Sequence, residues 1–193
     1  ASAQLANLLQ AGNVDVVVLP GNREQIYSAL DTGVADMAIT ASLPDNKIYD
    51  FEVLDSEELV LVAHRLLAQS LGGQTITPAL LNTLPVVSYD SQLPLIRQYF
   101  DTVFKQSCTS KIIARCPDIR ALAGIVRTGV GYTVLPDYIC HDDIQSGRLI
   151  KLGPQGPENN LYLAWRKGAL AHPRLNYARD VLMAFSNINK YAK

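Results

Sequence analysis

The chain has 193 residues, a net charge of −1 and 48% hydrophobic residues. This length can bury about 70% of the surface of the unfolded chain, in one domain or in two small lobes. The composition excludes a disordered protein, and the charge balance creates no field that favours nucleic acid or an anionic membrane. No apolar stretch approaches the ~20 residues of a bilayer-spanning helix, and no signal peptide opens the chain, so we expect a globular protein without a membrane span.

The N-terminal part of the chain alternates between helix and strand patterns. Ser2–Gln10 is predicted to be a helix with leucines on one side, and Val14–Leu19 is predicted to be a strand. Asn22 caps the next helix, because Gln25 three residues later completes a capping-box pattern. Asp36–Thr40 is the strand that follows this helix.

The rest of the chain continues the alternation, with apolar runs for strands and apolar periodicity or an initial proline for helices. The predicted strands are Glu58–His64, Leu84–Tyr89, Lys111–Arg115, Tyr132–Leu135, Leu149–Leu152 and Leu161–Trp165. Helices are predicted to begin at Pro78, Leu93, Asp118, Pro136 and Pro173, and the clearest loop is Gly153–Asn160. Regular alternation of this kind predicts an α/β fold.

The segment Ile125–Pro136, with the sequence IVRTGVGYTVLP, indicates how the sheet is connected. Gly129 stands where a helix ends in a left-handed turn, and the apolar run before Pro136 reads as a buried strand. Glycines that follow a helix and precede a strand have the reverse order of a dinucleotide-binding loop. The same helix–glycine–strand order occurs at Ile26–Thr40, which predicts two α/β lobes with a ligand cleft between them.

The motifs of catalysis and metal binding are missing from this sequence. It contains no nucleophile-elbow and no phosphate-loop pattern, and its three histidines lack zinc spacing. Glu57 and Glu58 are adjacent, so in a strand they point to opposite faces and cannot act as a carboxylate pair. His141 with Asp142 and Asp143 is interpreted as a polar turn and not as a metal cluster. We therefore predict a protein that is not an enzyme and that needs neither a cofactor nor a metal.

Polar residues at strand ends are the candidates for ligand contact. Thr40, Ser42 and Ser88 follow apolar strands, at the places where loops of an open sheet face a crevice. Asn22 marks the N-terminus of a helix, which can also attract an anion, and Asp118 marks another. Asp118 is interpreted mainly as a cap, since its carboxylate would repel an anionic ligand. Hydroxyl and amide groups of this kind suggest a small organic or aromatic acid as the ligand.

Six segments together resemble the effector-binding domain of LysR-type transcriptional regulators. In chain order they read LDTGVADMAI, LVLVAHRLLA, LPVVSYD, ALAGIVRTGVGYTVLP, SGRLIKL and LYLAWRKG. The second segment departs from the family pattern, with Arg65 and Leu66 where a proline and a leucine are usual. Each segment alone is weak, whereas six in the family's order over nearly the whole chain are a strong match.

The resemblance implies a type 2 periplasmic-binding-protein-like fold, in which two crossover strands join two Rossmann-like subdomains. We expect subdomain I to comprise residues 1–87 and 165–193, and subdomain II to comprise residues 88–164. An effector would bind in the cleft between the subdomains and modulate DNA binding and transcription. Family positions for effector contact fall near Asn22, Thr40, Ser88, Pro117 and Gly131.

The resemblance also implies partners outside this sequence. DNA would be bound by an N-terminal winged helix-turn-helix that this chain lacks, and the family's first strand is missing as well. We expect a homodimer or tetramer. A transport-linked solute-binding protein with the same two-lobed fold is the alternative, and a signal peptide on the gene product would support it.

Cysteine usage predicts a reducing compartment. Cys108, Cys116 and Cys140 are odd in number and lack CxxC spacing, which is typical of reduced thiols in a cytoplasmic protein. The family's peroxide sensors carry their cysteines just after the strand that matches LPVVSY, and Asp90–Phe104 has none. We therefore predict no thiol–disulfide switch.

Overall fold

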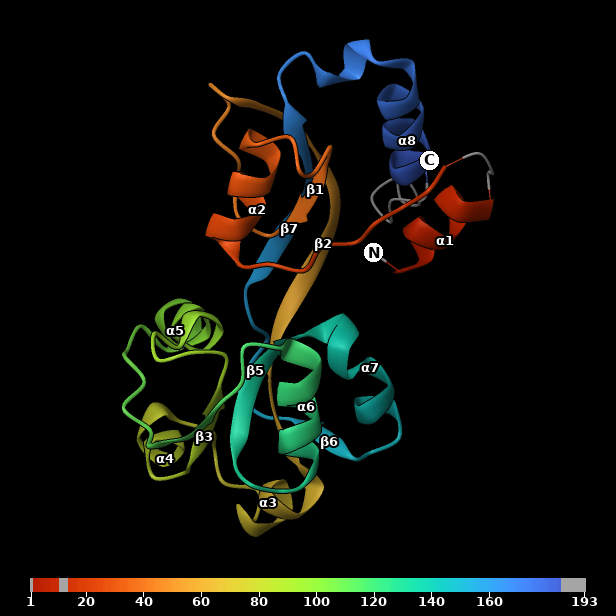
Figure 1. Ribbon diagram of the computed structural model, residues 1–193. Helices are drawn as coiled ribbons and strands as arrows, with labels where there is room; N and C mark the ends of the chain where they lie inside the picture. Colours follow the sequence, from red (N-terminus) through yellow and green to blue (C-terminus); the bar gives the residue numbers. More distant parts are fainter. Residues whose placement is uncertain (1, 11–13, 185–193) are drawn as a thin grey trace. The chain divides into compact units, whose positions relative to one another are not determined.

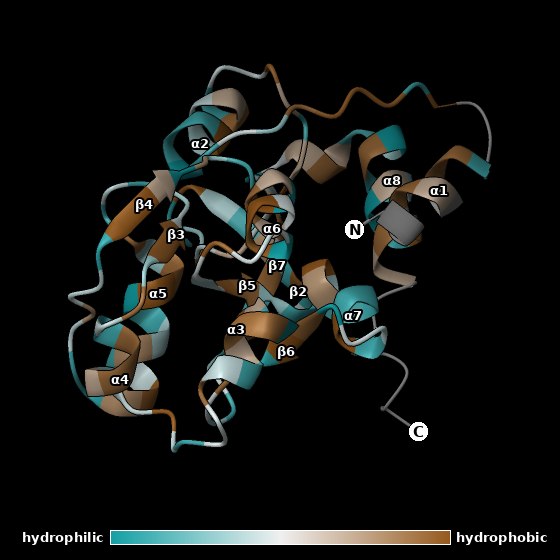
Figure 2. Ribbon diagram, turned by 90° about the horizontal axis from the view of Figure 1, so that it is seen from below, coloured by the Kyte–Doolittle hydropathy of each residue, from teal (hydrophilic) through white to brown (hydrophobic). Residues whose placement is uncertain are grey.

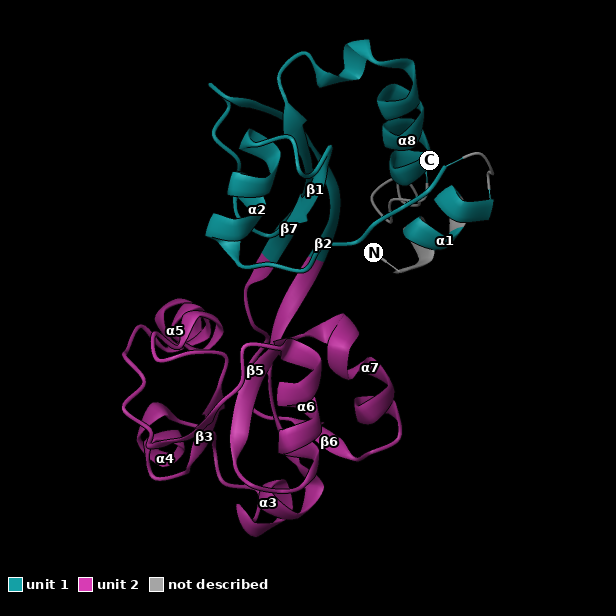
Figure 3. Ribbon diagram, viewed as in Figure 1, with its two compact units in different colours: residues 1–56, 159–193 teal, residues 57–158 magenta. Residues whose placement is uncertain are grey.

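The computed structural model describes residues 2–10 and 14–184 (Figure 1). The chain forms two compact units, residues 1–56 with 159–193 (unit 1) and residues 57–158 (unit 2) (Figure 3). The chain passes from one unit to the other within two strands, β2 (Tyr49–His64) and β7 (Glu158–Arg166). Two crossover strands therefore join two α/β units, as the sequence predicts.

In the residues that the structure describes, unit 1 combines a small sheet with three α-helices (Figure 1). Its elements besides the crossover strands are α1 (Ser2–Gln10), α2 (Arg23–Asp31), β1 (Ala38–Thr40), the 3-10 turn η2 (Ala169–Ala171) and α8 (Pro173–Ala184). β1 pairs antiparallel with β7, and β7 lies beside β2. The core joins apolar side chains of α1, β2, β7 and α8, which are Leu8, Leu54, Leu163, Trp165 and Leu182.

The capping box that the sequence predicts at α2 is present. The Asn22 side chain accepts the backbone N–H of Gln25 at 3.0 Å, and the Gln25 side chain accepts the backbone N–H of Asn22 at 2.9 Å. Two N–H groups of the exposed helix terminus are thus satisfied by local side chains.

The predicted strand Val14–Leu19 is wrong. These residues form no strand, and Val17 is 76% exposed. Val18 is 63% exposed as well. A β-branched run becomes a strand only where a neighbouring strand supplies ladder hydrogen bonds and a face to pack against. Within the part of the chain that the structure describes, this segment has no such partner.

Unit 2 is built on a mixed sheet. Its strands besides β2 are β3 (Val86–Ser88), β4 (Ile112–Arg115), β5 (Tyr132–Pro136) and β6 (Leu149–Lys151). β3 lies between β4 and β5 and is parallel to both. β5 and β6 pair antiparallel with β2. Figure 2 shows β3, β4 and β5 largely in the brown of apolar residues. β3 and β5 are buried along their whole length, whereas β4 alternates between partly buried and exposed residues.

Helices cover both faces of this sheet. They are α3 (Arg65–Ser70), α4 (Pro78–Asn82), α5 (Pro94–Tyr99) with the π-helical turn η1 (Phe100–Phe104), α6 (Ile119–Arg127) and α7 (Asp137–Gln145). Leu59 and Leu61 of β2 pack in one core with residues of α4, α5 and η1. Val60 and Val62 pack in a second core with α6 and α7. This alternation of side chains across β2 produces the helix–sheet–helix layers of a Rossmann-like unit.

The boundary of unit 2 lies earlier in the chain than the sequence places it. The expected change of subdomain is at residues 87 and 88, whereas unit 2 begins at Glu57. The reason is packing, because Leu71 and Leu81 lie in the same core as Tyr99 of unit 2. The return to unit 1 falls at the start of β7, and the expected boundary lies near its end.

Two strands begin before the apolar runs that predict them. β2 begins at Tyr49, ahead of the predicted strand Glu58–His64, and its first half mixes exposed, partly buried and buried positions instead of forming an apolar run. β7 begins at Glu158, inside the predicted loop Gly153–Asn160. The predicted strands are too short for the same reason in both cases, because a strand that contains polar side chains does not appear as an apolar run.

The glycines of the segment Ile125–Pro136 are scaffold residues, as predicted. Gly129 and Gly131 have φ values of 93° and 115°. A Cβ at Gly131 would lie 2.4 Å from the carbonyl oxygen of Pro85, so the chain can pass beside β3 only with glycine at this position. Among residues 2–10 and 14–184, every helix is too short or too polar to span a bilayer.

Candidate functional site

Three hydroxyl groups gather at the end of β1 in unit 1. The backbone N–H of Ser42 donates to Thr40 Oγ1 at 3.1 Å, and the two side-chain oxygens are 3.4 Å apart. Tyr27 Oη, from α2, donates to the Ser42 carbonyl at 2.9 Å and lies 3.2 Å from Ser42 Oγ. The structure therefore brings together the predicted contacts Thr40 and Ser42 and adds Tyr27 to them.

Asn22 belongs to the start of the same helix, where its side chain serves the capping box. Its amide oxygen accepts the N–H of Gln25, so this acceptor is already engaged in the structure. The exposed start of α2 is consequently a capped helix end, at which a ligand would meet the remaining N–H groups and the positive end of the helix dipole.

The carboxyl ends of β3 and β4 form a second polar edge, in unit 2. Ser88 pairs with Arg115 in parallel register, and the backbone N–H of Cys116 donates to the Ser88 carbonyl at 2.8 Å. Pro117 follows directly after Cys116, so Ser88 and Pro117 end neighbouring strands. The Ser88 side chain is 1% exposed and donates to the Asp90 carbonyl at 2.7 Å.

Gly131 lies at the opposite edge of the same sheet. It precedes β5, whose first residue Tyr132 pairs with Val86 at the start of β3. Parallel strands place their starts at one edge and their ends at the other. The structure thus separates Gly131 from Ser88 and Pro117.

Asp118 caps the helix that follows the β4 edge. One oxygen of its carboxylate accepts the N–H groups of Arg120 at 2.8 Å and Ala121 at 3.0 Å. The hydrogen bonds from Ala121 and Arg120 hold the pKa of Asp118 below its ordinary value. The N-terminus of α6 is therefore occupied by a charged side chain of the protein itself.

Arg115 is a residue that sequence reasoning missed at this edge. It is exposed, and its Nε donates to Ser91 Oγ at 3.0 Å. The sequence does contain a signal for Arg115, because this cationic residue ends a predicted strand. Tyr27 has no such signal, because only the fold brings it to Ser42.

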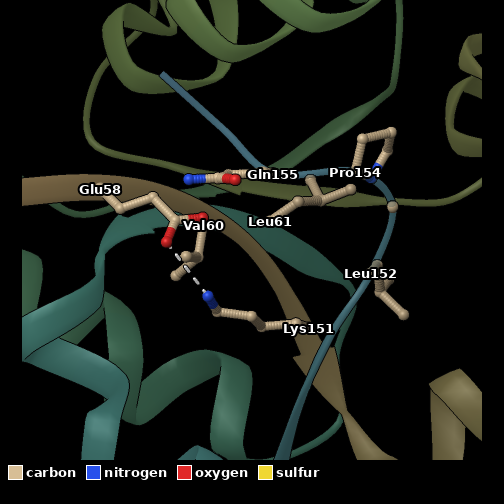
Figure 4. Close-up of a pocket in the computed structure, with 8 residues that line it drawn as sticks. Glu58, Val60, Leu61, Lys151, Leu152, Pro154 and Gln155 are labelled. Atoms are coloured by element: carbon tan, nitrogen blue, oxygen red, sulfur yellow. Dashed lines mark hydrogen bonds and ion pairs between the residues drawn. The ribbon is translucent and has the colours of Figure 1, made fainter. Parts of the chain in front are cut away.

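A cavity of about 330 Å³ lies within unit 2 (Figure 4). Its walls come from β2, from β6 and from the loop that leads into β7, and they consist of Glu58, Val60, Leu61, Lys151, Leu152, Gly153, Pro154 and Gln155. Lys151 Nζ lies 3.3 Å from Glu58 Oε2, as the dashed line in Figure 4 shows. The cavity contains none of the predicted contact residues.

The wall loop of this cavity is fastened to the body of unit 2. Tyr99 Oη donates to the Pro154 carbonyl at 2.5 Å, and the Leu59 N–H donates to the Pro157 carbonyl at 2.9 Å. Burial, followed by the charge of Glu58, raises the pKa of Tyr99 to about 12, so the hydroxyl stays a donor at physiological pH. These bonds fix the segment that enters the crossover strand β7.

The histidines have local structural roles. The Nδ1 atoms of His64 and His172 accept the backbone N–H groups of Leu66 and Arg174, each at 3.3 Å. His141 lies 2.8 Å from the Gln145 side chain. Among the residues that the structure describes, no group of three or more potential metal ligands occurs.

Asp143, which stands beside His141 in the sequence, is an ion-pair residue. It is 2% exposed and lies between Arg127, at 2.6 Å, and Arg148, at 3.0 Å. Its carboxylate thus ties α6 and the turn before β6 to α7. The interpretation of residues 141–143 as a solvated turn is wrong for Asp143, which is buried with two arginine partners.

Two α/β units joined by crossover strands, each with polar residues at a strand end, define a ligand-binding module of the type 2 periplasmic-binding-protein-like class. Residues 4–185 match the family described as LysR substrate binding domain. The chain therefore belongs to this family and is the effector-binding domain of a LysR-type regulator.

The relatives are transcriptional regulators. The HTH-type transcriptional regulator AbaB of Streptomyces antibioticus is 32% identical over 168 residues, which cover 84% of this chain and 56% of AbaB. The chain thus spans a little over half the length of this relative. These comparisons favour a regulator and give no support to a transport-linked solute-binding protein.

Solved structures share the fold at low sequence identity. ArgP from Mycobacterium tuberculosis has a TM-score of 0.83 and 18% identity, with 95% of this chain and 63% of ArgP covered. The Synechocystis PCC6803 CcmR regulatory domain in complex with 2-PG has a TM-score of 0.78 and 18% identity, with 96% and 90% covered. At this identity the likeness concerns the fold alone.

Proposed function

We propose that this domain binds a small organic acid and that the bound acid changes DNA binding and transcription by the whole regulator. The observation that carries the proposal is the family match over residues 4–185. The CcmR regulatory domain, whose fold is similar, was solved in complex with a small molecule, 2-PG. The domain senses its ligand without transforming it, so its role is not that of an enzyme.

The proposed contacts lie beside the termini of strands and of helix α2. In unit 1 they are Thr40 and Ser42, with Asn22 at the start of α2. In unit 2 they are Ser88 and Pro117 at one edge of the sheet, and Gly131 at the opposite edge. The hydroxyl cluster of Thr40, Ser42 and Tyr27 supports the unit 1 set, because Ser42 and Tyr27 are only partly buried and the Ser42 hydroxyl oxygen lies within hydrogen-bond reach of the other two. Ser88 supports the unit 2 set through its place at the end of a parallel strand.

A matched pair of buried threonines tests the unit 1 contacts. Thr40 and Thr133 are 6% and 1% exposed, and Thr133 Oγ1 donates to the Val87 carbonyl at 2.8 Å. Thr40→Val should weaken binding of the acid at least about 5-fold, since a site that hydrogen-bonds its ligand loses a partner. Thr133→Val should leave the affinity unchanged, although it also removes a buried hydroxyl.

Thermal-shift screening of the 193-residue chain identifies the acid, with benzoate and succinate as the first probes. A ligand that binds only the folded chain raises its melting temperature, and the increase grows with ligand concentration. Calorimetry then compares the two threonine variants and Ser88→Ala. Absence of stabilisation by every carboxylate would count against an organic acid as effector.

The regulatory part of the proposal concerns the whole protein. We propose that a separate N-terminal domain binds DNA, that the protein is a homodimer or tetramer, and that effector and DNA binding are coupled by about 1–3 kcal/mol. Such coupling changes operator affinity about 5- to 150-fold. Fluorescence anisotropy of an operator duplex with the full-length protein, with and without the acid, measures it. Equal affinities would refute the regulatory role, and sedimentation of the same sample determines the oligomeric state.

A further inference from the structure

The β3–β4 edge of unit 2 carries a cation whose side chain is held in place. Arg115 ends β4 beside Ser88, which ends β3 in parallel register. Its Nε donates to Ser91 Oγ at 3.0 Å, and Ser91 lies in the turn that follows β3. One nitrogen of the guanidinium is therefore anchored by the protein, which lowers the rotamer entropy that binding would otherwise remove.

The terminal amino groups of Arg115 remain available. Among the described residues, no carboxylate lies within 4.0 Å of this side chain, whereas Arg127, Arg148 and Arg179 each form an ion pair. The terminal N–H groups of an anchored guanidinium form a planar fork that matches a carboxylate.

The acidic residues near this edge are engaged by backbone N–H groups. Asp90 Oδ1 accepts the N–H of Gln92 at 2.7 Å, and Asp118 caps α6. Asp118 already accepts the N–H groups of Arg120 and Ala121, and its negative charge opposes an anion at the N-terminus of α6. The guanidinium of Arg115 is consequently the group at this edge that can bind a negative charge.

We propose that Arg115 binds the carboxylate of the effector and that Ser91 is its positioning residue. This inference rests on the proposed function and specifies the chemical group that selects the ligand. It predicts that acids bind and that their neutral amides do not, because an amide offers the fork one acceptor oxygen without a charge. Ser88 and Pro117, on the same edge, would then surround the remainder of the ligand.

The experiment compares two acids with their amides on the 193-residue chain. The probes are benzoate with benzamide and succinate with succinamide, and calorimetry measures the affinities. We expect wild type to bind at least one acid at least about 10-fold more tightly than its amide. Arg115→Gln should remove this preference, and Arg115→Lys should retain part of it, since lysine keeps the charge and loses the fork. Ser91→Ala should weaken binding of the acid about 2- to 5-fold.

Arg120→Gln is the matched control. Arg120 is also exposed, carries the same charge and lies at the start of α6, where its backbone N–H is bound by Asp118. This variant should bind the acid as wild type does, and equal melting temperatures of the two glutamine variants show that both are folded. Equal affinity of wild type and Arg115→Gln for the acid would overturn the inference, as would equal loss in Arg120→Gln.

The inference and the proposed function fail differently. If wild type binds no carboxylate but a neutral molecule changes operator binding by the full-length protein, the role of Arg115 is refuted and sensing stands. If acids bind through Arg115 while no ligand changes operator binding, the inference stands and the regulatory proposal fails.

Discussion

The two units of this domain differ in how closely their described segments pack. Unit 2 encloses its sheet between helices on both faces, and its chain approaches itself so closely that Gly131 and Gly156 have no room for a Cβ. Unit 1 holds a smaller core and leaves the apolar residues Val17, Val18 and Leu19 more than half exposed. We therefore expect substitutions that add or change atoms to lower the free energy of unfolding strongly in the core of unit 2 and only slightly on the exposed segment of unit 1.

The largest effect is expected at Gly156, in the loop that leads into β7. A Cβ there would lie 1.7 Å from the carbonyl oxygen of Leu59 and 2.9 Å from the Tyr99 ring. Because a backbone oxygen of a central strand cannot move aside, Gly156→Ala should reduce the free energy of unfolding by about 3 kcal/mol or more. The corresponding fall in melting temperature is about 6–12 °C, measurable by calorimetry.

Gly124→Ala is the control for this substitution. Gly124 lies inside α6, and a Cβ at this position meets nothing within 4 Å. Alanine is favoured over glycine in a helix by about 1 kcal/mol, so this variant should be more stable than wild type. Similar melting temperatures of the two alanine variants would show that the loop is not packed against β2.

The next effect separates a buried ion pair of unit 2 from an accessible one of unit 1. Asp143 is 2% exposed between two arginines, whereas the side chains of Glu52 and Arg179 are 37% and 26% exposed. Asp143→Asn leaves the guanidinium of Arg127 without its anion and should cost about 2–3 kcal/mol. Glu52→Gln should cost less than about 1 kcal/mol, because water screens this pair.

Urea denaturation of both variants measures these free energies. Both substitutions remove one negative charge and keep the shape of the side chain, so the change in net charge is the same. Equal losses of stability would contradict the burial of Asp143 between Arg127 and Arg148.

The sequence predicts the fold of unit 2 better than that of unit 1 for a physical reason. Strands such as β3 and β5 are buried on both faces and therefore appear as apolar runs between helices. The first half of β2 contains several polar residues, and Val14–Leu19 is mostly apolar without being paired. An apolar run indicates that its side chains favour burial. A strand also needs a second strand to pair with, and a short stretch of sequence does not show whether that strand is present.

The candidate site divides in the same way. Thr40, Ser42 and Ser88 could be selected because a hydroxyl after an apolar run marks the end of a strand. Their hydrogen bonds could not be foreseen, since Tyr27 reaches Ser42 only after α2 folds against β1. Arg115 was not predicted as a contact, because only neutral groups at strand ends were considered. Its side chain is nevertheless anchored by the hydroxyl of Ser91, in the turn after β3.

The smallest effect is expected on the exposed segment of unit 1. Valine and threonine are nearly isosteric, so Val→Thr replaces a methyl group by a hydroxyl and reports burial with little change of shape. Val17→Thr with Val18→Thr should change the free energy of unfolding by less than about 0.5 kcal/mol, since these side chains are 76% and 63% exposed. Val62→Thr, at a position of β2 with 0% exposure, should cost about 1–3 kcal/mol, because its hydroxyl would be buried between the sheet and its helices. Urea denaturation of the two variants compares these costs directly. A loss in the double variant as large as that of Val62→Thr would mean that Val17 and Val18 are buried in solution.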